Sequence, residues 1–519
     1  MPEYLSPGVY IEEVNTGPRP IEGVGTAMAA FVGFAPAGPA NKPQLVTNWT
    51  QYIEHFGALD ESGMRNPHMS GAFMSHSVYG YFMNGGSRCY VTRVVPNNGS
   101  SNGSAPKPAQ LQLPSRTSKA TPSLTFTPKE ASAGDVQIDI MPPSGEAPPE
   151  GSFTVRVRSG EVEETYDNVN LGKKGKPVAD TINQASKIVA VAEAVGTGSL
   201  IDRAPEVGNY IIKAAPAPAP TVLQSNHFVG SAADRSGLEG LEIADDATMI
   251  CCPDLMSAYM SGAIDRDGVK AVQLAMIAHC ERMADRMAII DPLPNLTPQE
   301  VKKWRESETN YDSKFAALYY PWLMVSGPDG KPMAVPPSGH MAGVWARSDS
   351  ERGVHKAPAN EVVRMALNPA SEITKGEQDV LNPIGVNCIR SFTGRGVRVW
   401  GARTLSSDPA WRYISVRRLF NYVEKSIENG TQWVVFEPND PGLWARVRRD
   451  VGAFLNNVWR DGMLFGLAPQ EAFFVKCDAE LNPPESRDLG RLVIEVGMAP
   501  VKPAEFVIFR FSQFSGGGQ

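Results

Sequence analysis

The sequence predicts an α/β protein whose main domain is built from two separated stretches of chain, with a β-rich domain inserted between them and an extended strand at each end. Strand-like and helix-like patterns alternate before about residue 95 and again from Ala247, whereas few helical patterns occur between these stretches. Both ends of the chain carry strand-like runs. The expected parts are an N-terminal arm and linker (1–20), a discontinuous α/β core (21–95 plus 226–504), an inserted domain (96–225) and a C-terminal arm (505–519).

The N-terminal run alternates as a strand does. A Pro7-Gly8 turn precedes it, and the stiff sequence TGPRP follows it. A frayed terminus is the alternative, but β-branched alternation is unusual in frayed termini, so we expect an ordered arm. Its strand-forming residues are Val9, Tyr10, Ile11 and Val14.

An α/β layer follows the arm. Thr26–Phe34 is expected to be a buried strand, and Asn48–Phe56 a helix that opens at an Asn or Thr cap. Gly71–Met83 is expected to be a second helix, which Gly85-Gly86 ends before a strand at Arg88–Val95.

The expected insert lies between two linker-like sequences, PNNGSSNGSAPKPA and APAPAP. Its pattern favours short strands, such as Ser123–Phe126, Asp135–Met141 and Ser152–Val157. Because α/β alternation resumes beyond it, we expect the insert to project outward from the core.

The second core stretch predicts a mainly parallel sheet flanked by helices, because strands and helices alternate. The expected elements are a strand at TMICCPDL, a helix at Val269–Ala284, a strand at Arg286–Asp291, a helix at Thr297–Glu306 and a strand at Phe315–Met324. Thr297, Pro298 and Glu300 have the spacing of a capping box with proline in the first turn.

The last part of the chain predicts a hairpin, two helices and two strands. The hairpin strands lie around Cys388 and Val399 and are joined through TGRG. The helices are Trp411–Ile427 and Pro441–Trp459, the second opening at an Asp440 cap, and the strands are Arg491–Val496 and Glu505–Phe514.

The stretch PPSGHMAGVWARSDSERGVHKAPAN, from Pro336 to Asn360, predicts a short amphipathic helix between two rigid turns. Ser338 is the expected cap and Gly353 the left-handed exit. Trp345 belongs to the apolar face, and we expect the helix to pack beyond the last strand of the sheet. The polar residues form a solvated face in the simplest interpretation, with Arg347 near Glu351 and Asp349 near Arg352 at helical spacing.

This stretch resembles the signature of contractile tail sheath proteins of phages and related contractile injection systems. The resemblance is reinforced by NPIGVNCIRSFTGRGVRVWGARTL, by LSPGVYIEEV near the start and by PAEFVIFRFSQ near the end. It covers both termini and most of the second half, whereas no motif matches between roughly Pro96 and Ser225. Family members vary there by insertions.

The composition and the motifs of the sequence exclude several classes of function. The formal net charge of −7 argues against a role in coating nucleic acid. No apolar run has the length of a membrane span, the first residues lack the pattern of a signal peptide, and the six cysteines are expected to be buried thiols.

No catalytic, cofactor or metal motif occurs, and the adjacent His279 and Cys280 fit a buried helix face better than a metal site. We therefore expect no enzyme activity and no cofactor. A large cytoplasmic α/β enzyme without a recognisable motif remains the alternative hypothesis, which the appearance of tubes would distinguish from a sheath subunit.

The resemblance implies a structural subunit that polymerises helically around an inner tube and contracts to drive the tube through a target envelope. Its implied partners are other copies of the chain, the tube protein, and baseplate and terminal cap proteins, with assembly in the cytoplasm and no membrane insertion. Family members join through terminal arms that add strands to neighbouring sheets. The C-terminal arm residues are then Phe506, Ile508, Phe509 and Phe511, and the candidate tube contacts are Arg446, Arg448 and Arg449.

Overall fold

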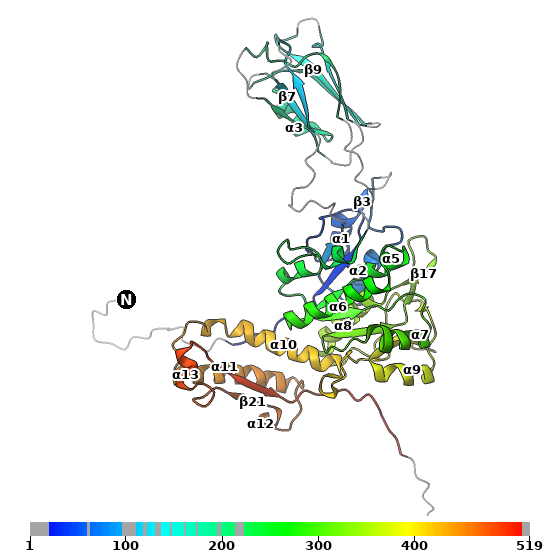
Figure 1. The fold of residues 1–519 in the computed structure, drawn as a ribbon, viewed down its shortest axis with the longest axis vertical. Coiled ribbons are helices and arrows are strands. Elements are labelled where there is room, and N and C mark those ends of the chain that lie inside the picture. Colours follow the sequence, from blue (N-terminus) through cyan, green and yellow to red (C-terminus); the bar gives the residue numbers. More distant parts are fainter. Residues whose placement is uncertain are drawn as a thin grey trace, which may run out of the picture. The chain divides into compact units, whose positions relative to one another are not determined.

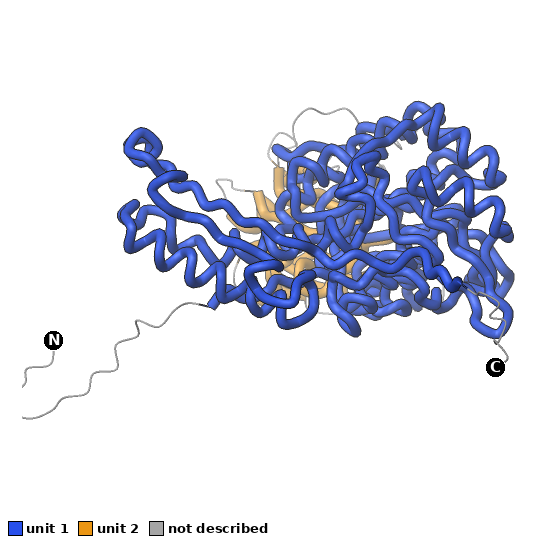
Figure 2. The backbone as a smooth tube through the Cα atoms, turned by 90° about the horizontal axis from the view of Figure 1, so that it is seen from below, with its two compact units in different colours: residues 1–96, 223–519 blue, residues 97–222 orange. Residues whose placement is uncertain are grey.

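The computed structural model describes residues 20–59, 63–95, 110–117, 122–129, 136–145, 148–159, 162–172, 175–194, 199–212 and 223–510. The chain divides into two compact units, residues 1–96 with 223–519, and residues 97–222 (Figure 2). The first unit is therefore assembled from two stretches of chain, and the second unit lies between them in the sequence.

An eight-stranded sheet forms the centre of the first unit, in the order β2-β5-β1-β13-β14-β15-β19-β20. Its strands are β1 (Ala29–Gly33), β2 (Gln44–Val46), β5 (Cys89–Arg93), β13 (Met249–Cys251), β14 (Met287–Ile290), β15 (Ala316–Tyr320), β19 (Val386–Phe392) and β20 (Gly396–Val399). The strands from β5 through β19 run parallel, and the two edge strands run antiparallel. The predicted mainly parallel sheet and the hairpin near Val399 are thus confirmed.

Helices cover this sheet (Figure 1). They are α1 (Trp49–Phe56), α2 (Met74–Asn84), α4 (Ser225–Val229), α5 (Asp254–Met260), α6 (Arg266–Met283), α7 (Pro298–Lys303), α8 (Ser338–Arg352) and α9 (Lys375–Leu381). Five of the eight begin within three residues of where the sequence predicts, and the other three, α4, α5 and α9, were not predicted. Asn48 caps α1, and Thr297 with Glu300 forms the predicted capping box of α7.

Two predicted strands are shorter than their apolar runs. TMICCPDL leaves the sheet after Cys251, because Asp254 already belongs to α5. The run Phe315–Met324 divides at Pro321, which has no amide to donate to a ladder. Its second half becomes β16 (Leu323–Ser326), which pairs with β17 (Pro332–Val335) and β18 (Asn368–Pro369) in a separate sheet.

Helix α8 does not pack beyond the last strand, so that prediction is wrong. It lies along α2 and contacts the central strands β13 and β14 (Figure 1). Gly339 and Gly343 make this close approach possible, since a Cβ atom on either would come within 2.5 Å of Ser77 or of Tyr81 on α2. The small residues of α8 therefore decide its position.

A layer of two long helices and a short sheet completes the first unit. It contains α10 (Ile414–Gly430), α11 (Pro441–Arg460), α12 (Pro469–Ala472), α13 (Pro484–Asp488), and the antiparallel strands β21 (Phe473–Lys476) and β22 (Glu495–Met498). Its core includes Leu419, Val447 and Leu455, and Ile21 from the start of the described chain packs into it. The predicted Asp440 cap of α11 is confirmed.

The second unit has its own hydrophobic core, which includes Phe126 and Phe153. Its sheets are β10-β9-β8-β12 and β11-β7-β6. The elements are β6 (Leu111–Pro114), β7 (Pro122–Pro128), β8 (Val136–Met141), β9 (Phe153–Ser159), β10 (Val162–Val169), α3 (Val178–Ala185), β11 (Val189–Glu193) and β12 (Gly208–Ile212). This unit occupies most of the stretch for which the sequence predicts a β-rich insert.

All six cysteines are buried free thiols, as predicted. None of the helices in the described ranges has the length and apolar character needed to cross a membrane.

Candidate functional site

The predicted signature helix, α8, is buried along most of its length instead of presenting a solvated charged face. Trp345 is fully buried, and Arg347 is 7% exposed. Arg347 donates hydrogen bonds to the backbone oxygens of Asn84, at 2.9 Å, and Val362, at 2.5 Å. It therefore ties α2 to the segment after α8, and its hydrogen bonds go to these backbone oxygens rather than to Glu351, its neighbour at helical spacing.

Asp349 forms a buried ion pair with Arg418 of α10. The side chains are each 4% exposed, and two parallel hydrogen bonds join guanidinium and carboxylate at 2.8 and 2.5 Å. Thr26 adds a hydroxyl donor to the same carboxylate at 2.6 Å. Asp349 is thus paired across the fold with Arg418 rather than with Arg352, its neighbour at helical spacing.

The guanidinium of Arg418 also lies over the ring of Trp345, with 4.8 Å between its carbon and the ring centroid. The indole nitrogen of Trp345 donates to the hydroxyl of Tyr319 at 2.8 Å. Arg418 therefore joins α8, α10 and the N-terminal strand region through one buried cation.

Only the end of α8 has the exposure that the sequence predicts. Glu351 and Arg352 are exposed, and Gly353 follows at a positive φ of 90°. Ser338 does not cap the helix, because its amide and hydroxyl donate to the buried Asp291 at 2.8 and 2.6 Å. Burial raises the pKa of Asp291 to about 7, while these hydrogen bonds oppose the rise.

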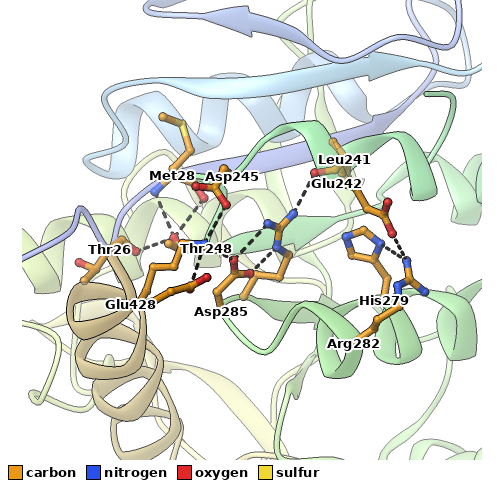
Figure 3. Close-up of polar contacts among 12 residues, drawn as sticks. Thr26, Met28, Leu241, Glu242, Asp245, Thr248, His279, Arg282, Asp285 and Glu428 are labelled. Carbon is orange, nitrogen blue, oxygen red and sulfur yellow. Dashed lines mark hydrogen bonds and ion pairs between the residues drawn. The ribbon is translucent and has the colours of Figure 1, made fainter. Parts of the chain in front are cut away.

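A second polar junction joins α10 to the core (Figure 3). Lys425 reaches Asp245 at 2.7 Å, Asp285 at 3.5 Å and Glu428 at 3.4 Å. Beside it, Asp285 holds the fully buried guanidinium of Arg286 at 2.7 Å. Asp245 and Asp285 lie just before β13 and β14, so this junction fixes α10 against the N-terminal ends of these two central strands.

The C-terminal segment is anchored where it leaves the core. The carboxylate of Glu505 accepts from Arg403 at 2.9 and 2.7 Å, from Asn382 at 2.7 Å and from Tyr413 at 3.0 Å. Burial alone would raise the pKa of Glu505, but the hydrogen bonds from Arg403 and Asn382 hold it below its ordinary value. We call this group the Glu505 clamp.

Beyond the Glu505 clamp the chain turns into solvent. The side chains of Phe506, Val507, Ile508 and Phe509 are between 69% and 78% exposed. Residues 501–510 form no strand within the subunit, so the predicted C-terminal strand is absent from this part of the single chain. Phe511 lies outside the described residues, as do Val9, Tyr10, Ile11 and Val14 of the predicted N-terminal arm.

The short sheet of β21 and β22 has two open edges in the described structure. Its inner face, which includes Val475 and Val496, packs on the core of α10 and α11. The amide of Ala499 donates across to the oxygen of Ala472. Because alternate amides of a strand point to the same edge, the amides of Val496 and Met498 face away from β21.

The candidate tube-contact arginines differ in their availability. Arg446 forms an ion pair with Glu437 at 3.1 Å, and Arg449 forms one with Asp450 at 2.9 Å. Arg448 donates to the backbone oxygen of Cys477, which places its charge against the subunit itself. The side chains of Arg446 and Arg449 are 47% and 56% exposed, so these two present charge to solvent.

The metal hypothesis for His279 and Cys280 gains no support, since both side chains are buried on α6. Within the residues that the structure describes, no three His, Cys, Asp or Glu side chains gather closely enough to hold a metal ion.

Sequence reasoning missed Arg418 and Glu505. The helical pattern of Trp411–Ile427 does carry a signal for Arg418, because a charged residue stands there beside the apolar Leu419 on the buried face. Glu505 lies between prolines and an apolar run, and its sequence neighbours give no sign of an ionic partner. Its contacts with Arg403, Asn382 and Tyr413 therefore could not be predicted from the sequence.

Comparison with known proteins identifies two adjoining family domains. Residues 243–405 match the phage tail sheath protein central domain, and residues 406–514 match the phage tail sheath C-terminal domain. Together these domains include α8, α10, α11, the short sheet and the Glu505 clamp.

Individual relatives agree with this result. The chain is 22% identical over 528 residues to the tail sheath protein of Burkholderia phage BcepMu, covering 96% of this chain and 94% of that protein. It is 28% identical over 185 residues to the tail sheath protein of Vibrio phage KVP40, which is 34% of this chain but only 26% of that longer protein.

A solved structure extends the likeness to nearly the whole fold. The helical sheath of the anti-feeding prophage in its contracted state matches with a TM-score of 0.57 and 25% identity, covering 98% of this chain and 99% of that one.

Proposed function

Because the chain belongs to the phage tail sheath family and is a subunit of a contractile sheath, we propose that its copies are linked through their terminal segments. The exposed apolar segment after the Glu505 clamp is the observation that carries this proposal. Phe506, Val507 and Ile508 are exposed and belong to no strand of the described structure, and such a segment gains hydrogen bonds and burial by pairing with another copy.

The acceptor we propose is the sheet of β21 and β22 in a neighbouring subunit. This sheet has two open edges, and its inner face is already fixed on α11. An arm that pairs at an edge satisfies outward-facing amides such as those of Val496 and Met498, each hydrogen bond contributing about 0.5–1.5 kcal/mol. The N-terminal arm around Val9 to Val14 is proposed to use the other edge in the same way.

Removing the outward-facing amide of Val496 tests whether the edge of β22 accepts the arm of a neighbouring subunit. We expect Val496→Pro to remove one hydrogen bond to an incoming strand and to obstruct its close approach, while an edge position tolerates proline within the subunit. The expected result is a folded subunit that forms few or no tubes in negative-stain images.

Val496→Thr is the matched control, because it retains the amide and the branched shape. Circular dichroism verifies that both variants are folded. Normal tubes from a folded Val496→Pro variant would exclude this edge of β22 as an acceptor.

The proposed cycle involves no bond chemistry. Subunits assemble in the cytoplasm as an extended helix around an inner tube, between a baseplate and a terminal cap, and rearrange into a shorter and wider helix that drives the tube through a target envelope. Buried ion pairs and the Glu505 clamp favour movement of each first unit as one body, with the change concentrated in the arms. Imaging extended and contracted particles tests this, since distances within the first unit should stay constant.

Arg446 and Arg449 are the proposed contacts with the inner tube, because their exposed guanidinium groups project from α11. Solvated ionic contacts contribute only about 0–1 kcal/mol each, which suits a surface that contraction must release. We expect the double variant Arg446→Glu with Arg449→Glu to sediment less with the tube protein at low salt.

Arg88→Glu provides a control of similar exposure elsewhere on the first unit. If the double variant and this control sediment equally with the tube, α11 does not face the tube.

A further inference from the structure

The turn between α10 and α11 presents an aromatic side chain in a strained conformation. Phe436 is fully exposed, with a relative exposure of 103%. Its φ is +68°, a left-handed conformation that bulky residues rarely adopt. Strain of this kind, combined with loss of apolar burial, points to an interaction made outside the single subunit.

Hydrogen bonds on both sides hold the turn in place. The amide of Val434 donates to the oxygen of Thr431 at 2.9 Å, and the amide of Glu437 donates to the oxygen of Val434 at 3.1 Å. The Glu437 carboxylate then pairs with Arg446, whose guanidinium lies 5.3 Å from the ring centroid of Trp433. These contacts fix the conformation of the turn, in which the side chain of Phe436 is exposed to solvent.

Further exposed apolar side chains belong to the same end of the subunit. Val435 precedes Phe436, and Leu489 follows α13, with exposures of 61% and 68%. Asn439 joins these segments, since its side chain donates to the backbone oxygen of Arg491 at 2.9 Å. We call Val435, Phe436 and Leu489 the turn patch.

The turn patch and the root of the C-terminal arm lie at opposite ends of α10. The Glu505 clamp includes Tyr413, directly before α10, and the turn begins at Thr431, directly after it. The 17 residues of α10 span about 25 Å. Figure 1 shows the C-terminal segment leaving the subunit at the end away from α13.

The three residues from Glu505 to Ile508 reach about 10 Å when fully extended, which is less than the length of α10. Phe506, Val507 and Ile508 therefore cannot reach the turn patch of their own subunit.

We propose that the turn patch binds the C-terminal arm of a second copy, on its way to the acceptor sheet. This inference rests on the proposed linkage by arms and adds a specific anchor to it. The apolar side chains of Phe506, Val507 and Ile508 complement the apolar turn patch, and the described residues cover neither of them. Because donor and acceptor lie at opposite ends of one rigid helix, each contact joins copies head to tail and produces an open chain of subunits.

Phe436→Gly tests the anchor with little risk to the fold, because glycine accepts a positive φ without strain. Burying a phenylalanine side chain is worth about 1.5–3 kcal/mol, which corresponds to a rise of roughly 10- to 150-fold in the concentration needed for assembly. Sedimentation of the full chain over a concentration series measures this threshold. Leu467→Ser is the control, since Leu467 is 95% exposed but lies outside the turn patch.

Cross-linking locates the contact directly. Phe436→Cys is combined in one chain with Phe506→Cys or Ile508→Cys, and assembled material is treated with a short bis-maleimide. The native cysteines are all buried. We expect a ladder of covalently joined chains from the pairs and no ladder from any single variant.

The outcomes separate this inference from the proposed function. An unchanged assembly threshold for Phe436→Gly, together with tubes that give no ladder, would overturn the turn patch while the arms still join the subunits. Tubes formed after removal of the C-terminal arm would overturn the proposed linkage itself.

Discussion

Truncation after Ala504 is expected to leave a folded subunit that no longer assembles into tubes. The change removes Phe506, Val507 and Ile508, which are exposed in the single subunit and are proposed to be buried against a second copy. Two such side chains contribute about 3–6 kcal/mol on burial. Their loss should raise the assembly threshold by at least about 100-fold. Negative-stain images and sedimentation measure assembly, and circular dichroism measures folding.

Two further variants distinguish the contribution of the C-terminal arm from that of the Glu505 clamp. Truncation after Phe514 keeps the whole predicted strand and should assemble normally. Glu505→Gln keeps the arm but weakens the ionic part of the Glu505 clamp, so we expect an intermediate threshold. If truncation after Ala504 leaves assembly intact, the C-terminal segment is an ordinary terminus and the proposed linkage fails.

Arg418→Met should lower the free energy of unfolding of the first unit by about 3–5 kcal/mol. The substitution leaves Asp349 buried without its ionic partner, and an uncompensated buried charge is costly. It also leaves the backbone oxygen of Thr26 without the donor at 2.9 Å. Urea unfolding followed by tryptophan fluorescence measures the effect, since Trp345 lies against the guanidinium.

The double variant Asp349→Leu with Arg418→Met removes both charges and should recover much of the lost stability. Arg266→Met is the surface control: Arg266 pairs with Glu308 at 3.0 Å but is 53% exposed, so its loss should cost less than about 1 kcal/mol. A loss for Arg418→Met no larger than that of this control would mean that the Asp349 pair contributes little.

Local chemistry made many elements predictable. Asn48, Thr297 and Asp440 cap helices where their side chains can accept from the first turn, and each cap was predicted from sequence. The TGRG hairpin and the strand near Arg286 followed from turn residues and apolar runs. The predicted cap at Ser338 was wrong because the Ser338 hydroxyl donates instead to the buried carboxylate of Asp291, 47 residues earlier in the chain.

The candidate site was likewise predictable in its local features but not in its long-range contacts. The sequence indicated that the stretch from Pro336 to Asn360 was a helix between turns, and the structure agrees. It could not indicate that Asp349 pairs with Arg418, 69 positions away, because helical spacing reveals only neighbours on the same helix. The Glu505 clamp depends likewise on Arg403 and Asn382, which folding brings together.

Caps, turns and apolar periodicity act within a few residues, so the α/β class, the principal helices, the parallel central strands and the family signature could all be predicted before the fold was known. The folded chain was needed to show which charges are buried, where α8 packs and where the Phe315–Met324 run divides. Burial and pairing depend on contacts between distant segments, which no local pattern encodes. The C-terminal segment illustrates this difference: its strand-like sequence is local, but a strand forms only where a second edge is available to pair with it.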